Sequence, residues 1–342
     1  MSELATGSAP ESSTIVGIDE AGYGPILGPL IVSAVAFDVP VALLRELKHP
    51  ADGPDLWKVL SASLAPRHNR RRPRLAVADS KRLYSGCNSE RGLVLLERAA
   101  LVFLRQVMEQ PASWRALLAG VCPGICKQLD EYPWYAGGDV DLPVQCRPDD
   151  LATQHNAVSH DMAANGVRFR GLWVEVLPEG HFNERVKATR NKSVVLFGLV
   201  TRLLQRVADA VGPRPLRIWI DRQGGRTSYA GPLMTAFQEA RLEIIEETET
   251  RSSYRLDTPW SPWMVRFVEK GETHHLPIAL ASIFSKYIRE LCMLRFNRYW
   301  ASHVAGLRPT GGYYADGQRF LADIEAALIA QGIDRGRLVR CV

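Results

Sequence analysis

An acidic pair near the amino terminus is the part of the chain best suited to chemistry. Asp19 and Glu20 follow residues 14–18, whose β-branched side chains predict a short buried strand, and the glycines and proline of residues 22–25 mark its end. Two carboxylates at the exit of a buried strand cost free energy unless a cation compensates them. The pair is therefore a candidate ligand for a divalent ion, with a solvated turn as the alternative.

A dinucleotide-binding turn is a competing interpretation of this stretch, because Gly22, Gly24 and Gly28 imitate its glycine pattern. The spacing is one residue too long, and Pro25 lies inside it. Residues 31–37 continue as a second β-rich run, where that motif needs a helix. The stretch favours two neighbouring strands joined by a glycine turn.

A third acid stands at the end of another predicted strand. Residues 216–220 read as a short strand, and Asp221 follows directly. An open α/β sheet places its chemistry at the carboxyl ends of its strands. Asp221 is therefore a candidate to join the acidic pair.

Two polar segments suit phosphate groups. Ser80 and Lys81 lie in a short turn ahead of a helix, where a hydroxyl, backbone N–H groups and an ammonium group can meet one phosphate; a helix N-cap is the alternative. At 3.6 residues per turn, Ser282, Lys286 and Arg289 fall on one face of a helix predicted over residues 276–289. This polar stripe suits a phosphate strand, or else a solvated face.

Composition and periodicity describe the elements around these residues. The chain has 342 residues, 46% of them hydrophobic, and a net charge of +5, which permits a nucleic-acid partner without requiring one. Helices are predicted over residues 89–109, 183–208 and 320–329, and strands over residues 167–177, 242–249 and 264–269. The expected organisation is a disordered leader (1–13), the first part of the main domain (14–109), an insertion (110–166), the second part of the main domain (167–300) and a C-terminal helical segment (301–342).

The insertion contains Cys122, Cys126 and Cys146. With His155 or His160 these cysteines offer a zinc site, but their spacing is loose and the fourth ligand is ambiguous. The favoured interpretation is an insertion that packs on the core or extends a nucleic-acid surface.

Several features predict where the protein works. The polar amino terminus lacks the apolar segment of a signal peptide, and no apolar run reaches membrane-spanning length. Six cysteines in a chain of this size indicate reduced thiols. We expect a soluble, cytoplasmic monomer that does not bind membranes.

Residues 17–29 resemble the opening motif of ribonuclease HII, the type 2 ribonuclease H family, which is written GIDEAGRGPxxGP. Tyr23 occupies the place of the family's arginine. Residues 79–83 are similar to the family's DSKxL motif, and residues 276–289 resemble its IxAASIxAKxxR helix. The KGD motif corresponds to a segment with Glu272 in place of the aspartate, and Tyr313 aligns with the tyrosine of a degraded HKGYxT motif.

The resemblance implies an α/β, ribonuclease H-like fold, with a mixed central sheet flanked by helices, an insertion atypical of the family and C-terminal helices. It implies a metal-dependent endoribonuclease that hydrolyses the RNA strand of RNA/DNA hybrids, or cuts at ribonucleotides embedded in DNA, and leaves 3′-hydroxyl and 5′-phosphate ends. Catalysis, with two Mg²⁺ or Mn²⁺ ions, would fall to Asp19, Glu20, Asp221 and Glu272. Substrate would be bound by Gly22, Tyr23, Gly24, Ser80, Lys81, Ser282, Lys286, Arg289 and Tyr313.

The departures from the family motifs leave two alternatives open. One is a nuclease of the same fold that acts on branched or structured nucleic acid, and the other is a nucleic-acid-binding protein without turnover. Tyr23 removes a charged phosphate donor but keeps a ring that can stack on a sugar or base. The extra methylene of Glu272 moves its carboxylate by roughly one bond length, which a flexible metal site tolerates at a cost in precision.

Overall fold

The structure, a computed structural model, describes residues 12–45, 53–69, 71, 73–84 and 92–341. Its centre is a seven-stranded sheet in the order β5-β2-β1-β6-β9-β8-β7, and a small second sheet pairs β3 with β4. The strands are β1 (Ser12–Ala21), β2 (Leu30–Pro40), β3 (Leu64–Ala65), β4 (Leu75–Ala76), β5 (Arg168–Leu177), β6 (Leu216–Asp221), β7 (Arg241–Glu247), β8 (Arg251–Asp257) and β9 (Pro262–Val268).

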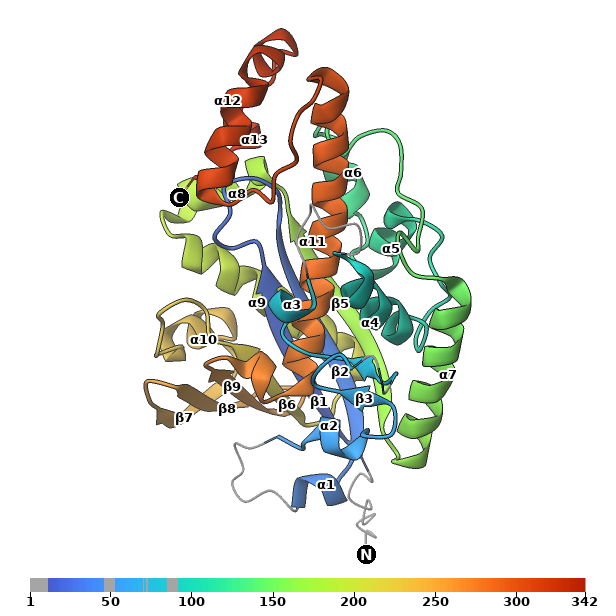
Figure 1. The fold of residues 1–342 in the computed structure, drawn as a ribbon. Coiled ribbons are helices and arrows are strands. Elements are labelled where there is room, and N and C mark those ends of the chain that lie inside the picture. Colours follow the sequence, from blue (N-terminus) through green and yellow to red (C-terminus); the bar gives the residue numbers. More distant parts are fainter. Residues whose placement is uncertain (1–11, 46–52, 70, 72, 85–91, 342) are drawn as a thin grey trace, which may run out of the picture.

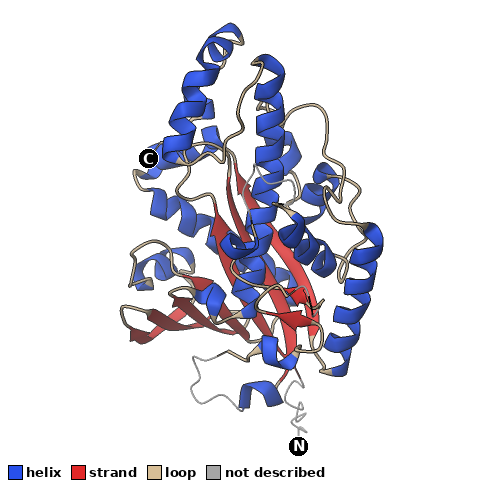
Figure 2. Ribbon diagram, in the orientation of Figure 1, coloured by secondary structure: helices blue, strands red, loops and turns tan. Residues whose placement is uncertain are grey.

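Helices cover the sheet and extend beyond it (Figure 1). They are α1 (Ala42–Arg45), α2 (Leu56–Val59), α3 (Ser80–Leu83), α4 (Val94–Leu104), α5 (Trp114–Val121), α6 (Ile125–Leu129), α7 (Pro148–Ala164), α8 (Glu179–Thr189), α9 (Lys192–Val211), α10 (Ala230–Ala236), η1 (Gly271–Thr273), α11 (Leu276–His303), α12 (Tyr314–Ala330) and α13 (Arg335–Leu338). Parallel and antiparallel pairs occur in one sheet with helices around it (Figure 2). The predicted fold class, α/β with a mixed central sheet flanked by helices, is confirmed. No helix in the described part of the chain has the length and apolar character needed to cross a membrane.

Strand β1 lies inside the sheet, between β2 and β6, and its side chains enter the two cores on either face. It pairs antiparallel with β2, as the glycine turn predicts, and parallel with β6. Because side chains alternate along a strand, Ile15 packs into the core that contains α4 and α11, while Val16 and Ile18 pack into the core that contains α9. Residues 1–11 of the expected leader lie outside the described residues, and Ser12 and Ser13 belong to β1 instead, paired with β2.

Helix α11 crosses β1 at a glycine that leaves no room for a side chain. A Cβ atom on Gly17 would lie 2.2 Å from the carbonyl carbon of Pro277 and 2.4 Å from the nitrogen of Ile278. Backbone atoms cannot move aside as the end of a flexible side chain can. Gly17 therefore sets how closely α11 approaches the sheet, and with it the position of the polar residues on that helix.

We expect Gly17→Ala to lower the free energy of unfolding by about 3 kcal/mol or more, because the strand and the helix must separate to admit the methyl group. Gly24→Ala is the matched control, since a Cβ atom there meets nothing within 4 Å. Urea denaturation of both variants measures the difference. Equal losses in the two variants would show that the contact between β1 and α11 yields easily.

The predicted insertion packs on the main core. Aromatic residues of the segment after α6, such as Trp134 and Tyr135, are fully buried. Cys122 and Cys146 are buried free thiols, and the Cys146 thiol lies 3.3 Å from the carbonyl oxygen of Val94. No group of three or more His, Cys, Asp or Glu side chains in the described ranges is arranged to hold an ion, so the structure gives the zinc alternative no support.

The single helix predicted over residues 183–208 is also wrong, because the chain forms α8 and α9 with a break between them. Arg190 has a positive φ of 54°, which ends α8 in the left-handed conformation. The Asn191 side chain then accepts a hydrogen bond from the backbone nitrogen of Ser193 and so caps α9. The break falls at Arg190, where the sequence has no glycine or proline to mark it.

Candidate active site

A cavity of about 410 Å³ lies beside the carboxyl ends of β1 and β6. Every residue that the sequence singles out for catalysis, metal binding or substrate binding lines it: Asp19, Glu20, Gly22, Tyr23, Gly24, Ser80, Lys81, Asp221, Glu272, Ser282, Lys286, Arg289 and Tyr313. Ala21, Pro25, Asp79 and Tyr84 complete the lining. The structure thus brings together residues from six separate stretches of the chain, and their roles stay predictions.

Parallel strands bring the acids to one edge of the sheet. β1, β6 and β9 lie side by side and run in the same direction, so their carboxyl ends meet. Asp19 and Glu20 lie near the end of β1, and Asp221 is the last residue of β6. Glu272 follows β9 in η1, whose Gly271 donates a backbone hydrogen bond of 2.8 Å to Asp221 Oδ1.

Burial and mutual repulsion raise the pKa of three of these carboxyls. Desolvation raises the pKa of Asp19 well above its usual range, and the charges of Glu20 and Asp221 add to the effect. Burial likewise raises the pKa of Glu20 to about 8 and that of Asp221 to about 7, with neighbouring carboxylates as the second cause. Lys81 opposes both shifts in pKa, yet the carboxylates prevail. The cavity therefore carries more negative charge than the protein compensates.

These pKa shifts predict how stability depends on pH. The folded protein holds protons on Asp19, Glu20 and Asp221 that the unfolded chain would release, so stability is lost as pH rises through the folded-state pKa values of about 7 and about 8. We expect the urea midpoint of the metal-free protein to fall between about pH 5 and about pH 9. Asp221→Asn should flatten the profile, and a slope as steep in the variant as in the original protein would contradict this origin.

The donor set fits hard divalent cations in its chemistry, since carboxylate oxygens are the ligands that Mg²⁺ and Mn²⁺ prefer. As the side chains stand, no group of three or more His, Cys, Asp or Glu residues in the described part of the chain could hold an ion. Asp19 Oδ1 accepts a hydrogen bond of 2.7 Å from the Glu20 nitrogen, and Asp221 Oδ1 accepts the bond from Gly271. These backbone hydrogen bonds restrain Asp19 and Asp221 within the acidic cluster.

The turn at α3 is a helix N-cap, and it also lines the cavity where the sequence predicts phosphate binding. Asp79 is the N-cap and accepts a hydrogen bond of 2.9 Å from the Lys81 nitrogen. Ser80 and Lys81 line the cavity, and the Ser282 hydroxyl donates to the Ser80 hydroxyl at 3.0 Å. The cap therefore holds a hydroxyl and an ammonium group at the cavity wall.

The polar stripe on α11 is buried and largely engaged by the protein, so the solvated-face alternative is wrong. Lys286 is 9% exposed and Arg289 is 1% exposed. Lys286 Nζ pairs with Glu290 Oε1 at 2.5 Å and lies 4.4 Å from the centre of the Tyr84 ring, whose hydroxyl also bonds Glu290. Arg289 Nη2 donates to the carbonyl oxygen of Leu27 at 3.0 Å. Arg289 thus supports the loop after β1.

Sequence reasoning missed Tyr84 and Glu290, which restrain Lys286. Glu290 follows Lys286 by four residues, so the two side chains share one face of the helix. This spacing could have predicted their ion pair from the sequence. Tyr84 ends α3 and reaches α11 only through the tertiary fold, so no local pattern marks it.

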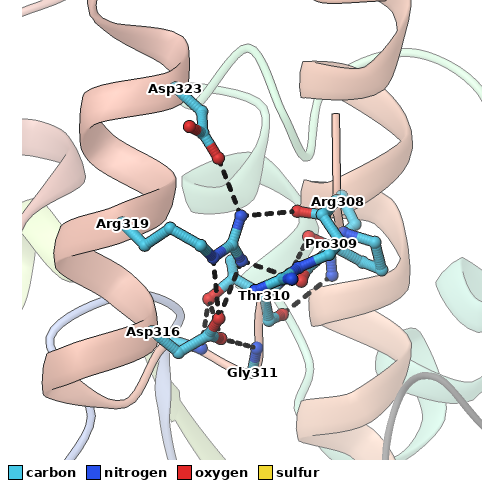
Figure 3. A network of polar contacts seen from close by, with 9 residues as sticks. Arg308, Pro309, Thr310, Gly311, Asp316, Arg319 and Asp323 are labelled. Atoms are coloured by element: carbon cyan, nitrogen blue, oxygen red, sulfur yellow. Dashed lines mark hydrogen bonds and ion pairs between the residues drawn. The ribbon is translucent and has the colours of Figure 1, made fainter. Parts of the chain in front are cut away.

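Tyr313 lines the cavity. Polar contacts hold in place the segment that precedes it (Figure 3). Asp316 accepts hydrogen bonds from the hydroxyl of Thr310 at 2.6 Å and from the nitrogen of Gly311 at 3.0 Å. Arg319 binds Asp316 and also donates to the carbonyl oxygen of Pro309 at 3.1 Å. The fixed segment presents the carbonyl oxygen of residue 312 to Ile26 and leaves Tyr313 56% exposed.

No protein-family model matches the chain, and no curated protein does. Among solved structures it is similar to RNase HII from Archaeoglobus fulgidus in its complex with PCNA, at 14% identity and a TM-score of 0.40 over 96% of this chain and 93% of that one. The ribonuclease H2 of Pyrococcus horikoshii OT3 matches at 11% identity and a TM-score of 0.40, over 95% and 92% of the two chains. Bst-RNase HIII in complex with Mn²⁺ matches at 13% identity and a TM-score of 0.43, over 99% and 72%.

The chain resembles ribonucleases HII and HIII. The TM-scores of these matches are below 0.5, so the matches carry no argument about function. The function proposed below rests on the side chains of the cavity.

Proposed function

We propose that the protein is a metal-dependent nuclease of the ribonuclease H type, which hydrolyses the RNA strand of an RNA/DNA hybrid or cuts at a ribonucleotide embedded in DNA. The observation that carries this proposal is the meeting of Asp19, Glu20, Asp221 and Glu272, from separate stretches of the chain, in one cavity. Hydrolysis of a phosphodiester needs such a cluster, because negative charge develops on both the attacking and the leaving oxygen.

The four carboxylates would hold Mg²⁺ or Mn²⁺. When bound, two such ions supply positive charge to the attacking and leaving oxygens. Asp19 is near enough to both Glu20 and Asp221 for their charges to raise its pKa, and it is the proposed shared ligand, with Glu20, Asp221 and Glu272 completing the set. The backbone bond from Gly271 restrains Asp221, so the protein holds at least one ligand in place before an ion arrives.

The loop after β1 is the proposed reader of the ribose. Gly22 has a positive φ of 91°, and Gly24 is exposed at the cavity, so backbone groups rather than side chains face the substrate there. A 2′-hydroxyl both donates and accepts hydrogen bonds, and this group distinguishes RNA from DNA. Tyr313 and Lys81 line the same cavity, and their proposed roles are to pack on a neighbouring sugar and to bind a phosphate.

Cleavage of matched duplexes tests the proposal. The substrates are a DNA duplex with one ribonucleotide, an RNA/DNA hybrid, an all-DNA duplex and a branched DNA, each with Mg²⁺, with Mn²⁺ and with EDTA. We expect metal-dependent cutting only of the first two, with 5′-phosphate ends. Cutting of the branched DNA alone would indicate a nuclease with another substrate, and binding without cutting under every condition would indicate a protein that has lost turnover.

A further inference from the structure

The last residues of the chain fold back beneath the loop that follows β1. Arg340 is 3% exposed, although it carries a charge, and its side chain reaches residues more than three hundred positions earlier in the sequence. Its Nε donates to the carbonyl oxygen of Pro25 at 3.1 Å, and its Nη2 donates to Pro25 and, at 3.2 Å, to the carbonyl oxygen of Tyr23. The Arg340 nitrogen also donates to Ile26 at 2.8 Å.

This tail is anchored independently of the loop. Asn183 on α8 donates to the carbonyl oxygen of Val339 at 2.7 Å and accepts from the nitrogen of Cys341 at 2.7 Å. The guanidinium carbon of Arg340 lies 4.6 Å from the centre of the Phe182 ring, also on α8. Arg340 therefore connects a fixed helix to the exposed part of the loop around Gly24, ahead of the buried Ile26 and Leu27.

The peptide between Tyr23 and Gly24 relates this contact to the cavity. The bond is trans, because the one cis peptide in the described residues joins Leu142 to Pro143. In a planar trans peptide the C=O and the following N–H point in opposite directions. Since the Tyr23 carbonyl points at Arg340, the Gly24 N–H projects from the other side, where Gly24 is exposed and borders the cavity.

The peptide between Pro25 and Ile26 shows the same arrangement. The Pro25 carbonyl accepts from Arg340, while the Ile26 nitrogen on the opposite side donates to the carbonyl oxygen of Gly312 at 2.8 Å. A carbonyl that accepts from a cation also makes its own peptide N–H a stronger donor. The guanidinium thus restrains the direction of both peptides and strengthens their N–H donors: Gly24 borders the cavity, while Ile26 is bonded to Gly312.

We propose that Arg340 is a positioning residue that orients the loop at residues 23–26 so that the Gly24 N–H faces the ribose-recognition side of the cavity. The part that concerns ribose rests on the proposed function. Arg340 touches no reacting atom and acts through the backbone. Selectivity for a ribonucleotide therefore depends on the carboxyl-terminal tail.

Arg340→Met and Arg340→Lys test the proposal, with Arg337→Met as the matched control. Arg337 lies on the same tail, donates to the carbonyl oxygen of Glu131 at 2.8 Å and lies over the Tyr132 ring, but it does not touch the loop. Amide hydrogen exchange at Ile26 is the first readout. We expect exchange at least about tenfold faster in Arg340→Met, an intermediate rate in Arg340→Lys, and no change in Arg337→Met.

The second readout is discrimination between RNA and DNA. It is measured as the ratio of the affinity for a duplex with one ribonucleotide to the affinity for the all-DNA duplex. Both affinities are measured in an Asp19→Asn background, which prevents cutting. We expect Arg340→Met to lower this ratio at least about fivefold with all-DNA affinity within about twofold, which lost stability alone would not produce. An unchanged exchange rate and ratio would overturn the proposal. If the original protein shows no preference for the ribonucleotide, the proposed function fails, while the exchange rates still decide whether Arg340 orders the loop.

Discussion

Asp19→Asn should lower metal-dependent cleavage by about a thousandfold or more while the protein stays folded. Asp19 is 7% exposed and lies among three other acids, so the variant removes a ligand at the point where the carboxylates are most crowded. It also removes a charge whose burial is unfavourable, because desolvation raises the pKa of Asp19. We therefore expect the metal-free variant to be at least as stable as the original protein at pH 8.

Asp38→Asn is the matched control for this experiment. Asp38 is 9% exposed on the neighbouring strand β2, but it does not line the cavity and instead accepts a hydrogen bond of 2.7 Å from Thr14. It also pairs with Arg170 at 3.5 Å. Its replacement should cost stability and leave the cleavage rate of the folded fraction unchanged. Full activity in Asp19→Asn, or equal losses in both variants, would contradict the role of the acidic cluster.

Glu97→Ala should lower the free energy of unfolding by about 3 kcal/mol or more, the largest loss of stability we expect from a polar residue. Glu97 on α4 is fully buried, and its carboxylate accepts hydrogen bonds of 2.6 to 2.7 Å from the backbone nitrogens of Val144, Gln145 and Cys146. The Tyr287 hydroxyl on α11 donates to it at 3.0 Å. One carboxylate thus joins the insertion to both helices, and its loss leaves several buried donors without an acceptor.

The control for Glu97→Ala is Glu325→Ala. Glu325 is half exposed and pairs with Arg335 at 3.0 Å, so its loss should cost less than about 1 kcal/mol. Urea denaturation of both variants provides the comparison. Similar losses at the two positions would show that the insertion is held by its aromatic packing instead.

The residues of the cavity could be predicted because local patterns mark them. Asp19 and Asp221 directly follow the predicted apolar strands at residues 14–18 and 216–220. In the structure Asp19 lies near the end of β1, Asp221 ends β6, and both line the cavity. The stripe of Ser282, Lys286 and Arg289 follows from helical spacing alone, and all three line the cavity. Spacing specifies which side chains share a face, whereas Glu272 and Tyr313 are named only through the resemblance to ribonuclease HII.

The sequence does not show which partners the polar side chains contact. Lys286 reads as a free phosphate donor until the fold brings Glu290 and Tyr84 to it. Strand β8 escapes prediction because its buried positions include Ser252 and Ser253, whose hydroxyls are satisfied by hydrogen bonds and not by apolar packing. Such contacts join distant parts of the chain, where no periodicity applies.

The dependence of the loop on Arg340 has the same origin. Its partner Tyr23 is 317 residues away in sequence, so only the folded chain relates the two. The sequence predicts only a helical segment there, yet Arg340 is 3% exposed in the structure. A buried guanidinium that contacts backbone carbonyls is a feature that only the structure reveals.

The most direct test of the central claim is anomalous diffraction at the manganese edge from crystals grown with MnCl₂. We predict anomalous peaks roughly 2 to 2.5 Å from carboxylate oxygens of Asp19 and of at least one of Glu20, Asp221 and Glu272. Ordered manganese elsewhere, with none in this cavity at saturating metal, would contradict a nuclease mechanism built on the acidic cluster.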